Sequence, residues 1–316
     1  MEISIIIVNY NGKNLLRMLL ASIKKSTFRD YEIIIVDNNS NDGSQEFIKK
    51  NYKIIKLVAN KKNLGYSGIN SALKHCKGKY ILFLNNDMEL DKDCIKNLIK
   101  SIRSDKGTVM VAPRLVNFYD KNVISGGTWV SRAFYNGHIK GNGVKAEEIP
   151  YLGVGLIRKD FVDMFGYLFD PDYFIYAEDL DLGLRIRLNG KKILFEPKAV
   201  MRHMHAVTTQ KISKSFTTFM MERNLLMTFF KVLSVKNILL YLPYVIFARF
   251  VAMLRDIVAL KVSLAISRLK AILYILFNFT KVIKKRRQTQ KFRNAEDPYI
   301  LKIFTEKYLF KPKFIV

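Results

Sequence analysis

The stretch Tyr80-Ile81-Leu82-Phe83-Leu84-Asn85-Asn86-Asp87 joins five apolar or aromatic residues to three polar ones. Such a run predicts a buried strand that stops abruptly. In open sheets of parallel strands, ligands bind beyond the carboxyl ends of the strands, so a carboxylate at position 87 would stand in the binding crevice. The same three polar residues also suit an ordinary turn. The stretch therefore indicates either a turn or a site for a metal and a phosphate.

Three apolar runs precede this stretch, at residues 3–8, 32–36 and 54–58. Helical patterns at residues 15–23 and 44–50, and a third through Ala72 and Leu73, separate the runs. Strands that alternate with helices predict an α/β fold with a doubly wound, mostly parallel sheet. Asp91 is expected to cap the next helix, which runs to about Arg103. All four strand ends would carry polar loops to one edge of the sheet.

The chain of 316 residues is 49% hydrophobic, which is ample for a packed core, and its net charge is +26. Residues 211–316 hold 21 Lys and Arg against 5 acids, so an anionic partner is expected there, either a nucleic acid or a membrane surface. Cys76 and Cys94 lack the spacing of a metal site, and two cysteines fit a reducing cytosolic location. The first residues indicate a strand rather than a signal peptide.

Neither Gly-x-Gly-x-x-Gly nor a P-loop follows the first strand, which disfavours a dinucleotide-dependent dehydrogenase and a P-loop NTPase. Phosphate would then have to be neutralised in another way. Mg²⁺ or Mn²⁺ bridges one or two carboxylates to substrate phosphates, and Asp87 is the candidate carboxylate.

Three motifs occur in order: Ser4-Ile5-Ile6-Ile7-Val8-Asn9-Tyr10-Asn11-Gly12, Ile35-Val36-Asp37-Asn38-Asn39-Ser40-Asn41-Asp42-Gly43-Ser44, and Leu84-Asn85-Asn86-Asp87. Between the second and third stands Asn63-x-Gly65-x-Ser67-x-x-Asn70. Together they resemble the inverting glycosyltransferases of family 2, which have the GT-A fold, and in particular the rhamnosyltransferase-like branch. The resemblance extends over essentially the whole chain and is clearest in residues 3–224.

The resemblance implies a nucleotide-sugar donor, linked to UDP or dTDP. Tyr10 would lie against the pyrimidine base, and Asp37 would accept the ring N–H of the base, although Asp37 also suits a turn. Asn85 replaces the first acid of the family's Asp-x-Asp position, where Asp87 would bind the metal. The other residues implied in nucleotide binding are Val8, Asn39, Asn63, Gly65, Asn70, Asn86 and Arg223.

Glu178-Asp179-Leu180-Asp181 resembles the family's Glu-Asp-x-Asp segment. The resemblance makes Asp179 the base that takes the proton of the acceptor hydroxyl, while Glu178 orients the acceptor or the base. Acids in the first turn of a helix also suit the helix dipole, which is a sufficient reason for Asp181. Arg185 and Arg187 are expected to partner these acids.

His203 matches the family's single histidine, which implies that it completes the Mg²⁺ or Mn²⁺ shell or touches the diphosphate. His205 is an additional histidine, and a His-x-His pair on a strand would place both rings on one face. A purely structural polar role for His203 stays open. Thr208 matches a hydroxyl position, and Arg223 stands in an Arg-Asn pair where it would contact phosphate.

Residues 1–230 are interpreted as a GT-A catalytic domain, with a nucleotide-sugar half at 1–112 and an acceptor and catalytic half at 113–230. Residues 115–150 carry little periodicity and suggest a loop. Residues 231–316 form a basic amphipathic tail without an uncharged run of about 18 residues, so the tail is expected to lie on an anionic leaflet rather than span it. A helical bundle packed on the catalytic domain is the alternative.

The sequence thus predicts a metal-dependent inverting hexosyltransferase, peripheral to the cytoplasmic face of the cell membrane. Its acceptor would be a lipid-linked saccharide in cell-surface polysaccharide synthesis. A sugar nucleotidyltransferase would need a basic phosphate loop after the first strand, where only Lys13 is available. Charge alone suggests a nucleic-acid-binding protein, but the basic residues lie among apolar helices, so no nucleic-acid partner is expected. The presence of Asp87, Asp179 and His203 disfavours an inactive scaffold.

Overall fold

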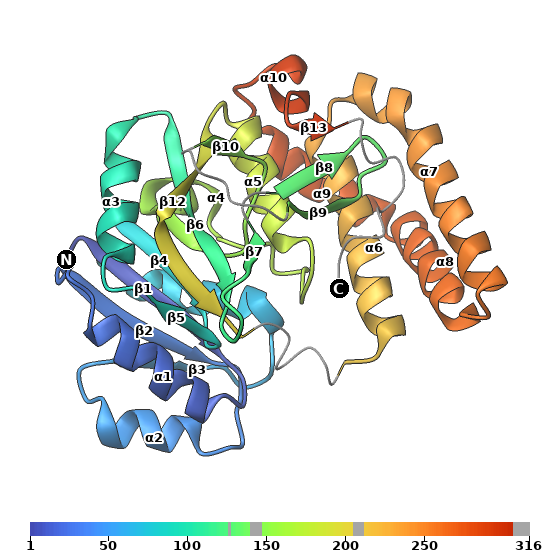
Figure 1. The fold of residues 1–316 in the computed structure, drawn as a ribbon. Helices are drawn as coiled ribbons and strands as arrows, with labels where there is room; N and C mark the ends of the chain where they lie inside the picture. Colours follow the sequence, from blue (N-terminus) through green and yellow to red (C-terminus); the bar gives the residue numbers. More distant parts are fainter. Residues whose placement is uncertain (126–127, 140–146, 205–211, 306–316) are drawn as a thin grey trace.

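A computed structural model of the chain describes residues 1–125, 128–139, 147–204 and 212–305 (Figure 1). One large sheet has the strand order β10-β12-β6-β11-β4-β1-β2-β3. Its strands are β1 (Ile3–Asn9), β2 (Tyr31–Asp37), β3 (Lys56–Ala59), β4 (Tyr80–Asn85), β6 (Thr108–Asn117), β10 (Glu147–Ile149), β11 (Gly155–Arg158) and β12 (Lys192–His203). The pairs β1–β2, β1–β4, β2–β3 and β6–β12 are parallel, whereas β11 runs antiparallel between β4 and β6. The predicted α/β class with a largely parallel sheet is confirmed.

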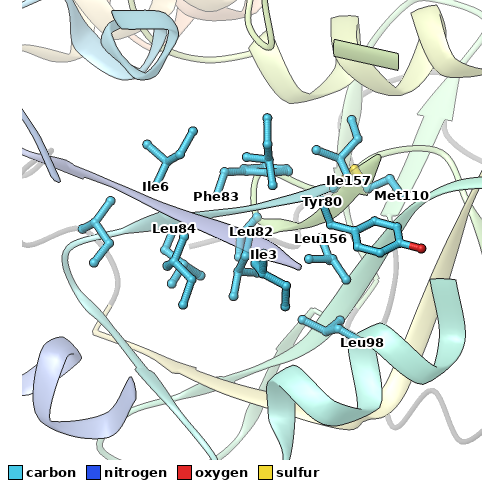
Figure 2. Close-up of a cluster of buried hydrophobic side chains, with 14 of the residues drawn as sticks. Ile3, Ile6, Tyr80, Leu82, Phe83, Leu84, Leu98, Met110, Leu156 and Ile157 are labelled. Atoms are coloured by element: carbon cyan, nitrogen blue, oxygen red, sulfur yellow. The ribbon is translucent and has the colours of Figure 1, made fainter. Parts of the chain in front are cut away.

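Strand β4 lies inside the sheet, and residues 81–84 are fully buried. Successive side chains of a strand point to opposite faces, so a continuous apolar run requires cover on both faces. In Figure 2, Phe83 extends from one face, whereas Leu82 and Leu156 extend from the other towards Leu98 of α3. Burying each such side chain contributes about 1.5–3 kcal/mol.

Helices cover the sheet, and most of the predicted elements are present. They are α1 (Lys13–Lys24), α2 (Ser44–Asn51), the 3-10 helix η1 (Gly65–His75), α3 (Cys94–Ser104), α4 (Lys159–Phe165) and α5 (Glu178–Leu188). Two boundaries were predicted wrongly. Ile54 is fully exposed ahead of β3, and α3 begins at Cys94 with Asp93 at the N-cap position and without a side-chain capping bond, while the carboxylate of Asp91 pairs with Arg202 at 2.6 Å.

The segment 115–150 was predicted as a loop, but its described part contains short strands. They are β7 (Val123–Ser125), which pairs with β6, β8 (Thr128–Ser131), β9 (Asn136–His138) and the edge strand β10. Strands of three or four residues show too few alternations for a period to be read from sequence. Trp129, Val130 and Phe134 are buried here in a second apolar cluster with α6. Gly126, Gly127 and residues 141–143 lie outside the described residues.

The C-terminal third is helical, as predicted, and its helices pack together and against α5 (Figure 1). Its elements are α6 (Lys214–Val232), α7 (Val235–Val258), α8 (Val262–Phe277), α9 (Phe279–Gln290), α10 (Asp297–Leu301) and the short strand β13 (Phe304–Thr305), which pairs with β8. The predicted boundary between residues 230 and 231 falls inside α6.

Among the described residues, α7 is long and apolar enough to cross a membrane by length and composition, and α8 with α9 would be a second candidate if counted as one bent segment. The expectation of no spanning segment rested on uncharged runs alone. A helix with few charges passes the same test of length and hydropathy without spanning a membrane, so the expectation stays a prediction.

Buried ion pairs bind these helices to the acceptor half. Lys231 of α6 places its Nζ 2.7 Å from Asp170 and 2.6 Å from Asp181. Asp181 also accepts a bond of 2.8 Å from Arg185, and Lys285 of α9 lies 2.5 Å from Asp170. A buried charge is tolerated only when it is paired and hydrogen-bonded, so these pairs fix the position of α6 and α9 against α5.

We expect Lys231→Met to lower the free energy of unfolding by about 3–5 kcal/mol, because the substitution leaves Asp170 and Asp181 buried with one cation fewer. Urea unfolding measures the change. Lys284→Met, on the exposed side of α9, is the control and should stay within about 0.5 kcal/mol of wild type. Equal losses in the two variants would contradict the role of the buried network.

Candidate active site

A chain of amide and carboxylate groups links the carboxyl ends of β4, β1 and β2. Asn86 Nδ2 donates to Asn9 Oδ1 at 2.8 Å, and Asn9 Nδ2 donates to Asp37 Oδ2 at 2.8 Å. A Cβ at Gly12 would lie 2.0 Å from Asn86 Nδ2, so only glycine leaves room for this amide. The contacts fix the side chain of Asn86 beside Asp87.

Asp37 is fully buried and accepts four hydrogen bonds. In addition to Asn9, its donors are the Ser40 hydroxyl at 2.7 Å, the Ser40 N–H at 2.9 Å and Gln45 Nε2 at 2.7 Å. A carboxylate has about four acceptor positions, so all are taken here. Asp37 orders the loop after β2, and a base N–H would have to replace one of these donors. Its contact with a base stays a prediction.

Three other candidates lie on the same rim. Val8 belongs to β1, where it pairs with Val36 on one side and Asn85 on the other. Tyr10 is 36% exposed in the loop after β1, which leaves its ring free to contact a planar ligand. Asn39 is exposed in the loop after β2, with a left-handed backbone at φ +65°.

The segment from Asn63 to Asn70 ties the two halves of the domain together. Asn63 Oδ1 accepts the Gly65 N–H at 2.8 Å, and the backbone of Gly65 is left-handed at φ +62°. A Cβ there would lie 1.9 Å from the carbonyl oxygen of Phe174. Asn70 Nδ2 donates to the Phe169 carbonyl at 2.7 Å, and its Oδ1 accepts from the segment at 168–169. The described contacts of Gly65 and Asn70 are structural, and their predicted contacts with nucleotide stay predictions.

Asp87 and His203 face each other. Asp87 follows β4, and His203 ends β12, where it pairs with Met88 of β5 (Met88–Leu90). His203 Nε2 lies 3.1 Å from Asp87 Oδ1. Asp87 Oδ1 is buried and accepts no hydrogen bond of good geometry in spite of this proximity. Asp87 Oδ1 and His203 Nε2 thus lie side by side just past the end of β4.

This pair fits a divalent cation. Two ligands in adjacent positions of an octahedral Mg²⁺ or Mn²⁺ site stand about 3.0 Å apart, close to the 3.1 Å observed. Within the described ranges, no group of three or more His, Cys, Asp or Glu side chains could hold a metal. A cation here would therefore complete its shell with phosphate oxygens and water, as Mg²⁺ usually does. His205 and Thr208 lie outside the described residues.

The second acidic pair begins α5 behind a strained turn. Tyr176 and Ala177 have left-handed backbones, with φ of +67° and +59°, and each costs about 1 kcal/mol or more for a residue with a Cβ. Asn224 of α6 holds the turn, because its Nδ2 donates to the carbonyls of Ile175 at 3.0 Å and Tyr176 at 2.7 Å. This left-handed turn sets the direction in which the side chains of Glu178 and Asp179 leave the first turn of α5.

Arg223, predicted to contact phosphate, supports this turn. Its guanidinium donates to Asn224 Oδ1 and to the Asp172 carbonyl at 2.8 Å, and lies against the rings of Phe219 and Tyr274. These contacts occupy N–H donors of the Arg223 guanidinium and hold Asn224 in position. A direct bond from Arg223 to a nucleotide stays a prediction.

Burial raises the pKa of both acids. The pKa of Glu178 is raised to about 8, first by burial and then by the charge of Asp179, and Glu178 Oε2 is buried without a hydrogen bond. Burial raises the pKa of Asp179 to about 6, although the Leu180 N–H donates to it at 2.8 Å. Burial therefore disfavours the ionised form of both carboxyls, and more strongly that of Glu178. Two neighbouring carboxyls with separated pKa values suit two different roles.

The expected arginine partners are confirmed only in part. Arg185 pairs with Asp181, which belongs to the structural network and not to the acidic pair. Arg187 binds Glu148 and the Tyr299 carbonyl instead, because it emerges from another side of α5. Glu178 and Asp179 consequently have no arginine among their described partners.

Tyr66 connects the two acidic groups and was not predicted as a site residue. Its hydroxyl donates to the Gly153 carbonyl at 2.6 Å, and its ring stacks on Phe169. Burial raises the pKa of the phenol well above its usual value, and the charges of Glu178, Asp179 and Asp87 raise it further. The carboxyl groups of Glu178, Asp179 and Asp87 thus all raise the pKa of the Tyr66 hydroxyl. An aromatic residue inside the Asn63–Asn70 motif was the only sequence signal for it.

Sheet register places the segment beside Asp179 at the carboxyl end of β4. Gly155 of β11 pairs with Phe83 of β4, so Gly153 lies beside the carboxyl end of β4. A Cβ at Gly153 would contact Asp179 Oδ2 at 3.5 Å. Asp179 thus lies against the segment that enters β11, and Asp87 pairs with His203 after β4. That these residues and Glu178 form one site stays a prediction.

Comparison with known proteins gives consistent matches. The model described as Glycosyl transferase family 2 matches residues 4–157. The O-antigen chain rhamnosyltransferase RfbN of Salmonella typhimurium is 27% identical over 224 residues, covering 67% of this chain and 69% of that protein. The UDP-Glc:alpha-D-GlcNAc-diphosphoundecaprenol beta-1,3-glucosyltransferase WfaP of Escherichia coli is 30% identical over 190 residues, covering 58% of this chain and 72% of that protein.

A solved structure shows the same fold. The crystal structure of GalNAc-T7 with UDP, GalNAc and Mn²⁺ aligns with a TM-score of 0.64 and 19% identity. The alignment covers 89% of this chain and 57% of that chain.

We expect Glu178→Gln to stabilise the protein in a pH-dependent way. Because the pKa of Glu178 is raised to about 8, folding above the unfolded-state pKa of about 4.3 requires proton uptake. The resulting loss of folding stability is absent below the unfolded-state pKa of about 4.3 and grows as the pH rises towards 8. The variant should gain more than about 1 kcal/mol of unfolding free energy at pH 8 and little at pH 4.5.

Urea unfolding at the two pH values measures this gain. Glu46→Gln, an exposed position on α2, serves as the control and should show no such difference. A gain for Glu178→Gln that is the same at both pH values would contradict the raised pKa.

Proposed function

Because the chain belongs to glycosyl transferase family 2, we propose that it is a metal-dependent inverting hexosyltransferase that uses a UDP- or dTDP-linked sugar. The observation that carries the proposal is geometric: the Asp87–His203 pair, 3.1 Å apart, follows β4, and Asp179 lies against Gly153 beside the carboxyl end of the same strand. The cation-binding pair and the acidic pair would thereby face one substrate from two sides. The name of WfaP includes a UDP-sugar, which supports the donor class.

On the donor side, Asp87 and His203 would hold Mg²⁺ or Mn²⁺. A bound cation would offset the negative charge of the leaving diphosphate, which is a Lewis-acid role. The UDP and Mn²⁺ in the GalNAc-T7 structure support this assignment for the shared fold. Asn86, fixed by Asn9, stands next to Asp87 and would contact the ribose or phosphate.

On the acceptor side, Asp179 acts as the general base. The acceptor oxygen attacks the anomeric carbon, its proton passes to Asp179, and the bond from the anomeric carbon to the diphosphate oxygen breaks. A single displacement inverts the anomeric configuration without a covalent sugar–enzyme intermediate. Protonated Glu178 donates a hydrogen bond and orients the acceptor.

The acceptor is proposed to be a lipid-linked saccharide in cell-surface polysaccharide synthesis. RfbN and WfaP support this proposal, since their names specify an O-antigen chain and a diphosphoundecaprenol-linked sugar. The protein would meet such an acceptor at the anionic cytoplasmic leaflet, as a peripheral protein. Residues 235–294 contain 13 Lys and Arg against one acid, which favours this surface.

The contacts of α7 support a helix that lies on the leaflet. Arg249, in the middle of α7, is fully buried and lies 3.1 Å from Glu222 of α6. Its guanidinium also donates to the Ala133 carbonyl at 2.9 Å. A spanning α7 would break both contacts and expose Arg249 to lipid at a cost of at least about 2.5–3.5 kcal/mol.

We expect Asp179→Asn to lower the rate of sugar transfer about 10²–10⁴-fold, because the acceptor proton has no base to receive it. Donor binding, measured by calorimetry with UDP or dTDP, should stay within about twofold of wild type. In the wild-type enzyme, activity should fall as the pH drops below about 6, where Asp179 becomes protonated. Transfer by the variant at the wild-type rate would contradict the assignment.

We expect Asp87→Asn to weaken Mn²⁺-dependent binding of UDP or dTDP by about tenfold or more, since the amide lacks the charge of a metal ligand. Calorimetry with and without Mn²⁺ measures the effect. Asp91→Asn is the matched control, because Asp91 pairs with Arg202 on the nearby surface. If chelation of divalent metals left wild-type binding and transfer unchanged, the metal assignment would be overturned.

A further inference from the structure

The turn between α7 and α8 exposes apolar side chains at the outer edge of the molecule. Val258 is 84% exposed, Leu260 is 88% exposed and Val262 is 51% exposed. Figure 1 shows the two helices at the side of the protein opposite α1 and α2. An exposed apolar turn at this place has no role in the core.

Leu260 occupies a position where glycine is usual. The Lys261 N–H bonds to the Asp256 carbonyl at 2.7 Å and the Leu260 N–H bonds to the Ile257 carbonyl at 2.9 Å, which together form a Schellman motif. Its left-handed residue is Leu260, with φ +57°. Leucine is strained there and gains no burial within the protein. The left-handed backbone of Leu260 serves no packing within the protein, which is a reason to look for a function of its side chain outside the core.

The apolar turn continues into an apolar face. Exposed apolar residues recur along both helices, and those at helical spacing include Leu239, Ile246, Phe250, Leu254 and Ile257 on α7, and Ile266, Leu269, Leu273 and Leu276 on α8. Leu240, Phe247 and Phe277 are exposed as well. Pairing between α7 and α8 places the two rows on one hairpin. Soluble monomers seldom expose apolar patches of this extent unless the patch binds something.

The charged residues beside the α7–α8 hairpin indicate which kind of partner its apolar face binds. Arg255, Lys261 and Lys270 are exposed beside the apolar rows. The one acid in this stretch, Asp256, is buried and paired with Arg268 at 2.8 Å. Apolar side chains with exposed cations and no exposed acid match an anionic lipid leaflet, whose headgroups attract Lys and Arg while its acyl region accepts leucine.

We propose that the α7–α8 turn inserts into an anionic bilayer and that Leu260 is its leading side chain. The inference rests on the membrane location proposed above and adds the element that enters the lipid. The left-handed backbone points the leucine out of the turn, where burial in acyl chains offsets the strain. The turn thereby sets which side of the protein meets the leaflet.

Leu260→Gly separates this proposal from a plain turn, because stability and binding should change in opposite directions. Glycine relieves the left-handed strain, so the melting temperature of the soluble protein should rise by about 2–4 °C. Loss of the inserted side chain should weaken binding to vesicles of phosphatidylcholine with phosphatidylglycerol about tenfold. Flotation or sedimentation with vesicles measures the binding.

Matched variants complete the test. Leu260→Asn tolerates the same backbone and should also bind weakly, whereas Leu260→Met should bind as wild type does. Wild type should bind vesicles of phosphatidylcholine alone more weakly than the anionic ones. Wild-type affinity of the Leu260→Gly variant for anionic vesicles would overturn the proposal. So would a wild-type dimer that Leu260→Gly converts to a monomer, since the face would then bind a second copy.

Failure here is distinguishable from failure of the proposed reaction. Sugar transfer to a soluble acceptor analogue without vesicles should be unchanged in Leu260→Gly, because residue 260 is remote from the acidic pair in the fold. Loss of vesicle binding with intact transfer supports the inserted turn. Absence of transfer in the wild-type enzyme would count against the reaction and not against the turn.

Discussion

The hydrogen bonding of β4 between a parallel and an antiparallel neighbour is the constraint on which the site depends. Its parallel neighbour β1 brings the loops after β1 and β2 to the carboxyl end of β4. Its antiparallel neighbour β11 runs the other way, so the segment entering β11 arrives at that same end and carries Gly153 against Asp179. The Tyr66 hydroxyl joins the two sides by its bond to Gly153. A fully parallel sheet would deliver only the first set of loops.

The site stores unfavourable energy that the rest of the fold offsets. Glu178 is buried without a partner for Oε2 among the described residues, and Tyr176 and Ala177 adopt left-handed backbones immediately before it. The surrounding contacts hold this arrangement, namely the Asn224 amide on the turn and the Lys231 network beneath α5. Active sites commonly keep such strain and raised pKa values because the chemistry requires them. The C-terminal helices α6 and α9 therefore help to hold α5 and the turn before it in place.

Sequence reasoning succeeded where one local signal was sufficient. Strands β1, β2 and β4 are apolar runs closed by polar loops, whereas β3 begins two residues later than predicted. The resemblance singled out Asp87, Asp179 and His203, whose roles stay predictions. Sequence reasoning failed where the decisive partner is distant in the chain. Lys231 meets Asp170 across 61 residues, and no local pattern reveals that pair. Arg223 and Tyr66 show the same limit, because their contacts with Asp172 and Gly153 depend on tertiary packing. Strands β8 and β9 were missed because they are too short to show a period.

The most direct measurement is a crystal structure with Mn²⁺ and UDP, located by anomalous scattering. The account predicts a manganese peak about 2.1–2.2 Å from Asp87 Oδ1 and His203 Nε2, with the diphosphate between this peak and Asp179. A manganese peak remote from Asp87, or a diphosphate that does not lie between the metal and Asp179, would contradict it.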